Sequence, residues 1–254
     1  MALSRRKVVG AGLAIGAILI LAAQLPAPTE QAAGTVRSSR TVIGTSVRGR
    51  SIVAVHRWRP GASKRVLVIG SIHGDETAGL KVIDRLMAAT PPADVDVWLI
   101  PTANPDGNAA RTRRNARRVD LNRNLPYDWR RSDPASRTYS GPRPASEPET
   151  RALMAFVSRY HPRITVVLHQ PLFGVDSEGT KALPVAEELA RRTGLPLKPM
   201  LCGSACRGTF TGWHNRYTPG RAVTVELGAT ASSLRLDWVA SAVLKVGSEY
   251  GDVS

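Results

Sequence analysis

The sequence predicts an α/β fold in a single domain, and two observations indicate it. Short β-branched runs alternate along the chain with segments whose apolar residues recur at helical spacing, which is typical of a sheet with helices on its faces. Beyond a distinctive N-terminal stretch about 220 residues remain, which is enough for one buried core and too few for two comfortable domains. We therefore expect one domain over residues 35–254.

The individual elements follow from local patterns. Apolar runs rich in Val and Ile predict strands at 51–58, 65–70, 95–100, 163–169 and 221–227. Apolar residues at helical spacing predict helices at 77–89, 147–160 and 181–193. Ser146 and Glu149 form a capping-box pattern ahead of the second helix, so we expect that helix to start there.

Residues 1–34 are typical of an export signal or N-terminal anchor followed by a linker. Arg5, Arg6 and Lys7 precede sixteen residues without a charge, and a stretch rich in Pro, Ala, Thr and Gln comes next. The apolar run is shorter than the roughly 20 residues that a membrane-spanning helix needs, which favours a cleaved signal over a retained anchor. We expect an extracytoplasmic protein, either secreted or held to the membrane only through this segment.

Net charge and cysteine content indicate which kinds of partner and which compartment suit this chain. The formal net charge of +15 favours an anionic partner, such as nucleic acid, an anionic envelope polymer or a carboxylate-rich substrate. No zinc-finger, RRM-like or basic-zipper pattern is present, so we do not expect a nucleic acid partner. Cys202 and Cys206 are the two cysteines, and outside the cytoplasm they can form a small-loop disulfide.

Candidate metal ligands stand at the ends of two predicted strands. His73 and Glu76 follow strand 65–70 in the turn where a helix begins, and His169 ends strand 163–169. Open α/β sheets place ligand sites at such strand ends. Two histidines and one carboxylate leave a fourth position for water, which is the arrangement of catalytic rather than structural zinc. Taken singly, each residue has an ordinary alternative as a loop histidine or a helix-start carboxylate.

Glu226 is the fourth candidate, because it stands at the end of the apolar strand 221–227. A carboxylate is costly to bury there without a partner. Near zinc-bound water it can act as a general base. The alternative is a salt bridge to one of the many arginines, and the sequence leaves both interpretations open.

Several short motifs occur together in one order. They read "HGDE", "NPDG", "RRN", "VDLNRN", a strand-end "HQPL", "GTFTGW" and "VTVELG". In this combination the chain resembles the zinc carboxypeptidase family, and it looks most like the murein peptide amidase branch, over about residues 65 to 230. The resemblance implies a mixed, mostly parallel central sheet with helices on both faces and one Zn²⁺ per chain. It also implies an amidase that cleaves the γ-D-glutamyl to diaminopimelate bond of cell-wall peptides.

The resemblance implies roles residue by residue where the motifs align. His73, Glu76 and His169 take the places of the zinc ligands, and Glu226 takes the place of the general base. The first arginine of "RRN", Arg113, takes the place of the residue that stabilises the oxyanion, although Arg114 stands next to it and leaves the register open.

Two further positions of the alignment concern the substrate. Asn122 and Arg123 of "VDLNRN" take the place of the pair that binds the substrate carboxylate, for which an arginine fork and an amide donor are chemically suited. A mobile tyrosine of the family has no aligned counterpart, and Tyr217 stays unassigned.

The leader separates this chain from murein peptide amidases that recycle wall fragments in the cytoplasm, so we expect trimming of wall peptides outside the membrane. The alternatives are a general metallocarboxypeptidase, an acyl-amino-acid deacylase, and an inactive module that binds wall fragments. The sequence does not give the side-chain preference of the pocket or the oligomeric state.

Overall fold

The structure is a computed structural model that describes residues 2, 34–179, 181–200 and 206–252. Residues Ala33–Ser254 form one compact unit. Most of the expected leader and Cys202 lie outside the described residues, so the expectations about export and about a Cys202–Cys206 disulfide stay predictions. Among the residues that are described, no helix has the length and apolar character needed to cross a membrane.

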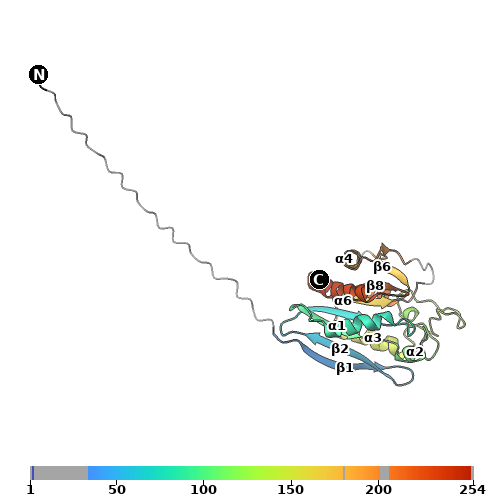
Figure 1. Ribbon diagram of the computed structural model, residues 1–254. Coiled ribbons are helices and arrows are strands. Elements are labelled where there is room, and N and C mark those ends of the chain that lie inside the picture. The colour runs from blue at the N-terminus through green and yellow to red at the C-terminus, as the bar shows by residue number, and fades with distance from the viewer. Residues whose placement is uncertain (1, 3–33, 180, 201–205, 253–254) are drawn as a thin grey trace. The chain divides into compact units, whose positions relative to one another are not determined.

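Eight strands in the described chain form one mixed sheet, which confirms the α/β prediction. They are β1 (Arg37–Thr45), β2 (Ser51–Trp58), β3 (Lys64–Ile69), β4 (Val95–Ile100), β5 (Ile164–His169), β6 (Leu172–Asp176), β7 (Leu197–Lys198) and β8 (Arg221–Gly228). Their order is β1-β2-β4-β3-β5-β8-β6-β7. The four central strands β4, β3, β5 and β8 run parallel, while β1, β2 and β6 each pair antiparallel to a neighbour. Figure 1 shows β1 and β2 toward one edge and β6 toward the other.

Helices cover both faces of this sheet. They are α1 (Ala78–Ala88), α2 (Pro105–Ala110), α3 (Pro148–Tyr160), α4 (Leu183–Thr193), α5 (Phe210–Tyr217) and α6 (Ser233–Tyr250), with a 3₁₀ turn η1 (Leu121–Arg123). One apolar core joins the sheet to α1, α4 and α6, and a second joins it to α3 and α5. In β3, Val66 and Val68 belong to the first core and Leu67 and Ile69 to the second. Burial on both faces explains why the central strands read as continuous apolar runs.

The predicted strands and helices are all present, with ends shifted by at most two residues. Strands β1, β6 and β7 were not predicted, because β1 is largely exposed and polar and the other two are short. Helices α2, α5 and α6 were also missed. The longest of them is α6. It begins where Ser232 accepts a hydrogen bond from the backbone N–H of Arg235, at 3.2 Å.

The capping box at Ser146 is wrong. Helix α3 has Glu147 as its N-cap residue and Pro148 in its first turn. The Ser146 hydroxyl instead donates to Glu147 Oε1 at 2.7 Å, and Glu149 accepts the backbone N–H of Val47 at 3.0 Å. The carboxylate of Glu149, which the local pattern assigned to the helix cap, is thus bound by the distant turn between β1 and β2.

Candidate metal centre and substrate cavity

His73, Glu76 and His169 form a buried cluster at the carboxyl ends of β3 and β5. Glu76 Oε1 lies 2.8 Å from His73 Nδ1, and Glu76 Oε2 lies 2.8 Å from His169 Nδ1. The two Nδ1 atoms are 3.2 Å apart. The structure therefore brings together all three candidates from distant parts of the sequence.

The donor set fits zinc. In a tetrahedral site with metal–ligand bonds of 2.0–2.1 Å, neighbouring donors lie about 3.3 Å apart. The two Nδ1 atoms are 3.2 Å apart, close to that value, and one ligand atom from each of the three residues can be taken so that all lie within 4.8 Å of one another. Both imidazoles also turn the same atom, Nδ1, toward the shared centre, which leaves each Nε2 free for an outer partner.

The turn that carries His73 and Glu76 is fixed by close backbone packing. A Cβ on Gly74 would lie 1.9 Å from the carbonyl carbon of Gly107, in α2. The Ser71 hydroxyl donates to the His73 carbonyl at 2.5 Å. The glycines of "HGDE" and "NPDG" are thus the contact point between two loops, and this contact accounts for both motifs.

Asp120 orders the cluster from outside, and sequence reasoning assigned it no role. It is fully buried, and its Oδ1 accepts from His73 Nε2 at 3.0 Å and from the Asn122 backbone N–H at 2.9 Å. Its Oδ2 accepts from Nε and Nη2 of Arg113, each at 2.9 Å. Carboxylates behind metal-binding histidines commonly fix the ring in this way. The available signal was an acid placed between Val119 and Leu121 inside the "VDLNRN" motif.

The electrostatics of the cluster depend on these contacts. Burial alone raises the pKa of Glu76, but hydrogen bonds and charge interactions with His169 and then His73 hold that pKa well below its ordinary value. Burial alone lowers the pKa of His73, but Asp120 and then Glu76 outweigh it and raise the pKa. The carboxylates at the cluster are therefore held in the charged form that a cation requires.

The two adjacent arginines, Arg113 and Arg114, make different contacts. Nη1 of Arg113 lies 3.3 Å from Glu76 Oε1, and Arg113 lines the same cavity as the cluster. Arg114 points elsewhere, because its Nη1 donates to the carbonyl of Ser136 at 3.0 Å. Arg113 is thus the arginine beside the cluster.

Asn122 and Arg123 lie in the turn η1, at the wall of that cavity. Asn122 Oδ1 accepts the Phe210 backbone N–H at 2.8 Å, and its Nδ2 lies 3.4 Å from His169 Nε2. Arg123 Nη1 donates to the Asn122 carbonyl at 2.6 Å, whereas the buried Nε of Arg123 has no hydrogen-bond partner in the described chain. A donor left open in this way is suited to an anionic ligand.

Glu226 lies beside His169, because the register of β5 and β8 pairs these two residues. The residue is 8% exposed and its Oε2 accepts the Leu172 backbone N–H at 3.1 Å. No arginine within the described residues forms an ion pair with it, which removes the salt-bridge interpretation. Burial raises the pKa of Glu226, against a smaller lowering from His169.

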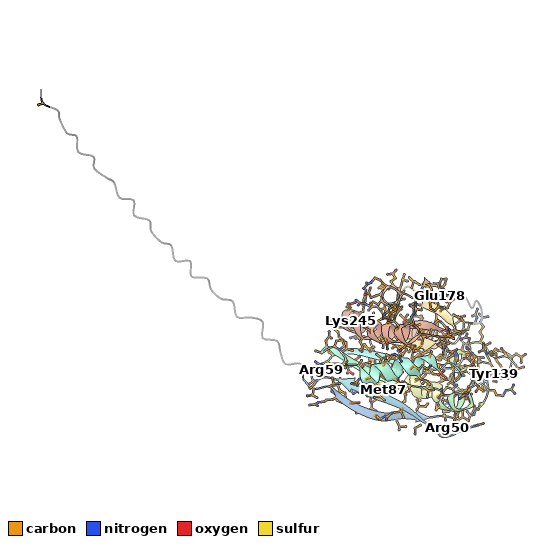
Figure 2. All side chains as sticks on the ribbon, in the orientation of Figure 1. Arg50, Arg59, Met87, Tyr139, Glu178 and Lys245 are labelled. Carbon is orange, nitrogen blue, oxygen red and sulfur yellow. The ribbon has the colours of Figure 1, made fainter. Side chains whose placement is uncertain are left out.

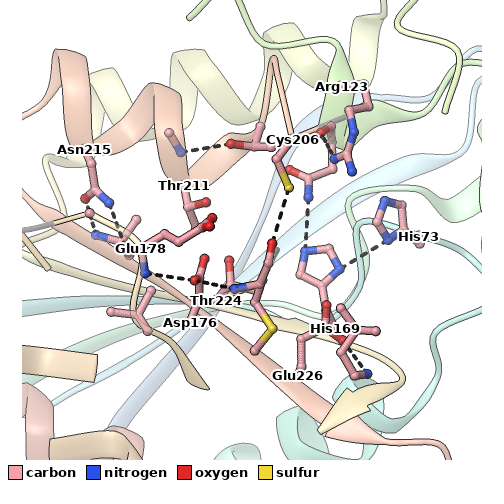
Figure 3. A pocket seen from close by; sticks show the side chains of 18 of the residues that line it. His73, Arg123, His169, Asp176, Glu178, Cys206, Thr211, Asn215, Thr224 and Glu226 are labelled. Atoms are coloured by element: carbon pink, nitrogen blue, oxygen red, sulfur yellow. Dashed lines mark hydrogen bonds between the residues drawn. The ribbon is translucent and has the colours of Figure 1, made fainter. Parts of the chain in front are cut away.

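A cavity of about 580 Å³ joins these groups. The lining includes every candidate named from the sequence, namely His73, Glu76, Arg113, Asn122, Arg123, His169 and Glu226. In Figure 3 His73, His169 and Arg123 lie on one side, and Asp176, Thr211 and Asn215 lie away from them.

Two tyrosines lie near this cavity and differ in exposure. Tyr217 is 62% exposed and meets Tyr127 edge to face, with ring centroids 6.0 Å apart. Tyr127 lines the cavity, and sequence reasoning did not name it.

Comparisons with known proteins agree with this geometry. A family model described as zinc carboxypeptidase matches residues 35–171. Murein peptide amidase A of Vibrio campbellii is 29% identical over 222 residues, which cover 82% of this chain and 86% of the relative. Murein peptide amidase A of Escherichia coli K12 is 31% identical over 186 residues, which cover 67% of this chain and 76% of the relative.

Solved structures are similar as well. The crystal structure of a murein-tripeptide amidase from Escherichia coli O157 has a TM-score of 0.67 at 25% identity and covers 85% of this chain and 94% of that one. Carboxypeptidase A from Helicoverpa armigera has a TM-score of 0.72 at 20% identity, covering 84% and 68%, which is a likeness of fold. Because the family model spans more than half of the sequence, the chain belongs to the zinc carboxypeptidase family.

Proposed function

We propose that this zinc hydrolase cleaves an amide bond next to a free carboxylate in peptidoglycan stem peptides, between a γ-D-glutamyl residue and diaminopimelate. One observation carries the proposal: a single cavity is lined by the His-Glu-His cluster, by the buried Glu226 and by Arg123, whose buried Nε has no hydrogen-bond partner among the described residues. Relatives named murein peptide amidase, which match most of the chain, support the choice of substrate.

The metal would be held by Nδ1 of His73, by the carboxylate of Glu76 and by Nδ1 of His169. When bound, zinc polarises the carbonyl of the scissile bond and lowers the pKa of the water that attacks it. Asp120 keeps His73 in the required tautomer, because its Oδ1 accepts the proton on Nε2 at 3.0 Å. The backbone N–H of Gln170 donates to Glu76 Oε2 at 3.2 Å and helps to hold that carboxylate in place.

Glu226 acts as the general base in this proposal. Its carboxylate takes a proton from the attacking water and passes it to the nitrogen of the leaving amine as the C–N bond breaks. A buried carboxylate with a raised pKa holds that proton better than an exposed one does.

Arg113, Asn122 and Arg123 bind the two anionic groups of the reacting substrate in this proposal. Arg113 lies beside the cluster and donates to the oxyanion that develops on the carbonyl oxygen. Asn122 and Arg123 hold the free carboxylate of the leaving residue, Asn122 through its amide and Arg123 through its guanidinium fork.

We also propose that the enzyme works outside the cytoplasm, on wall peptides rather than on recycled fragments. Support comes from the basic and apolar segment at residues 1–34 and from the net charge of +15, which favours approach to an anionic wall.

Mass spectrometry of products tests the proposed bond. Purified zinc-loaded enzyme is incubated with L-Ala-γ-D-Glu-diaminopimelate and, separately, with ordinary peptides that end in a free carboxylate. We expect release of diaminopimelate from the tripeptide, and none after chelation of the metal. Fast trimming of the ordinary peptides with an intact tripeptide would instead identify a general carboxypeptidase.

A further inference from the structure

The wall of the cavity opposite the metal cluster carries an acid that the proposed chemistry does not use. Asp176 ends β6 and lines the cavity together with Thr224 of β8. Gly174 pairs with Glu226 and Val175 with Val225, and the next step of this antiparallel register brings Asp176 beside Thr224. Figure 2 shows the neighbouring Glu178 at this edge of the molecule.

The distance along β8 between Asp176 and the proposed general base, Glu226, follows from strand geometry. Ala222, Val223, Thr224 and Glu226 of β8 line the cavity, and Thr224 and Glu226, two residues apart, lie on the same face of the strand. Two residues of a strand span about 7 Å. Asp176, beside Thr224, is therefore displaced about 7 Å along β8 from Glu226. This distance is similar to the roughly 6 Å from the α-carbon to the terminal ammonium of an extended four-carbon side chain.

The carboxylate of Asp176 is half-buried and only partly satisfied. Its Oδ1 accepts the backbone N–H of Glu178 at 2.9 Å and that of Met200 at 3.3 Å. Its Oδ2 has no hydrogen-bond partner and the residue has no ion pair among the described residues. Burial raises the pKa of Asp176, with the two backbone hydrogen bonds opposing it. The charged form thus lacks a cation, although several cations line other parts of the same cavity.

We infer that Asp176 is a specificity-determining residue, and that its Oδ2 binds a side-chain ammonium on the residue whose α-carboxylate is held by Asn122 and Arg123. The inference rests on the proposed function, since it names the class of leaving residue for that same site: an amino acid with a terminal ammonium, such as diaminopimelate or lysine. A charge-assisted hydrogen bond in a partly dry cavity is strong enough to select such side chains over aliphatic ones.

A purely structural role for Asp176 makes a different prediction. The backbone N–H groups of Glu178 and Met200 both donate to Oδ1 of Asp176, and asparagine supplies an oxygen in the same place. Asp176→Asn therefore keeps the turn and removes the charge. Glu187→Gln is the matched control, because Glu187 is exposed on α4 and lies outside the cavity lining while its loss changes the net charge equally.

Calorimetric binding of free meso-diaminopimelate, lysine and norleucine to the zinc-loaded enzyme tests the subsite without turnover. We expect the unmodified enzyme and Glu187→Gln to bind the first two at least tenfold more tightly than norleucine. Asp176→Asn should lose this preference at least tenfold while its affinity for norleucine changes less than twofold. An unchanged preference in Asp176→Asn, or an equal loss for all three amino acids, would overturn the inference.

Cleavage of L-Ala-γ-D-Glu-X peptides, with X as each of these residues, separates this inference from the proposed function. If no tripeptide is cut but Asp176→Asn abolishes the binding preference, the proposed substrate falls and the subsite stands. If the tripeptides are cut equally well by both forms with unchanged KM ratios, the subsite falls and the hydrolase stands.

Discussion

The two carboxylate oxygens of Asp120 connect the metal cluster to the turn η1 that carries Asn122 and Arg123. One carboxylate holds the His73 ring, the Arg113 guanidinium and the backbone of Asn122 at the same time. Three side chains with different proposed tasks are therefore positioned by one buried group. Charge interactions with His73, Arg113 and Arg123 outweigh burial and hold the pKa of Asp120 well below its ordinary value.

Glu226→Gln tests the general base. The amide keeps an oxygen that can accept the Leu172 backbone N–H, so the fold and the cluster should persist. We expect kcat to fall about 100-fold to 10,000-fold, because an amide cannot take the proton from water. Steady-state kinetics measures this effect, and metal analysis should find zinc retained. Full turnover in Glu226→Gln would mean that another group acts as the general base.

At the scale of elements, strand ends and loop contacts build the site. β3, β5 and β8 deliver His73, His169 and Glu226 to one edge of the sheet because these three strands are parallel neighbours. The loop with α2 then packs on the turn after β3 through Gly74 and Gly107. Side chains that are far apart in the sequence therefore lie together at the metal cluster, although each follows directly from the end of its own strand.

Gly74→Ala should damage this packing. An added Cβ would lie within 2.4 Å of three backbone atoms of Gly107 and Asn108, and backbone cannot move aside as a side chain can. We expect a loss of about 3 kcal/mol or more in the free energy of unfolding, measured by urea denaturation, with weaker zinc binding. Gly34→Ala is the control, since the nearest atom to its added Cβ is 3.4 Å away. Equal stability of the two variants would contradict the packing argument.

His214 links α5 to β5 and makes folding depend on pH. Its ring is fully buried and lies 3.0 Å from Thr165 Oγ1 and 3.1 Å from Thr218 Oγ1. Burial, with a further contribution from Lys181, lowers the pKa of His214 to about 3. Because the unfolded chain takes up the proton near pH 6.5, the stabilising effect is complete above that pH and declines as pH falls toward 3.

Denaturation of the metal-free protein at pH 7 and pH 5 measures this contribution. Between pH 7 and pH 5 the unmodified protein should lose about 2 kcal/mol more of its free energy of unfolding than His214→Asn does, because the variant lacks the buried imidazole. The same pH dependence in both proteins would mean that His214 is not the titrating group.

At the scale of the whole molecule, two apolar cores on opposite faces of one sheet support the site at its edge. The cluster and Asp120 bring two imidazoles and two carboxylates into the interior, where they hydrogen-bond to one another, to Arg113 and to the backbone N–H groups of Asn122 and Gln170. A metal that binds the folded chain and not the unfolded one shifts the folding equilibrium.

Removal of zinc should therefore lower the melting temperature by roughly 10 °C, for a metal present at about a thousand times its Kd. Calorimetry of the chelated protein, with and without added zinc, measures the shift, and magnesium serves as the control cation. A melting temperature that does not respond to zinc would speak against a metal at His73, Glu76 and His169.

The fold class, the five longest apolar strands and the set of polar residues that line one cavity could be predicted from the amino-acid sequence. These features have local signals: strands buried on both faces leave continuous apolar runs, one-sided helices leave a helical period, and strand ends are marked by a change from apolar to polar residues. The same local reasoning misplaced the start of α3, because the carboxylate of Glu149 is held by a turn more than one hundred residues away.

Three features are visible in the folded chain alone: Arg113 and not Arg114 lies beside the cluster, Asp120 lies behind His73, and Asp176 lies beside Thr224. Each depends on contacts between segments that are distant in the chain, and such contacts leave no periodicity in the sequence. The pairing of His169 with Glu226 has the same origin, since register between parallel strands is set by the packing of both sheet faces.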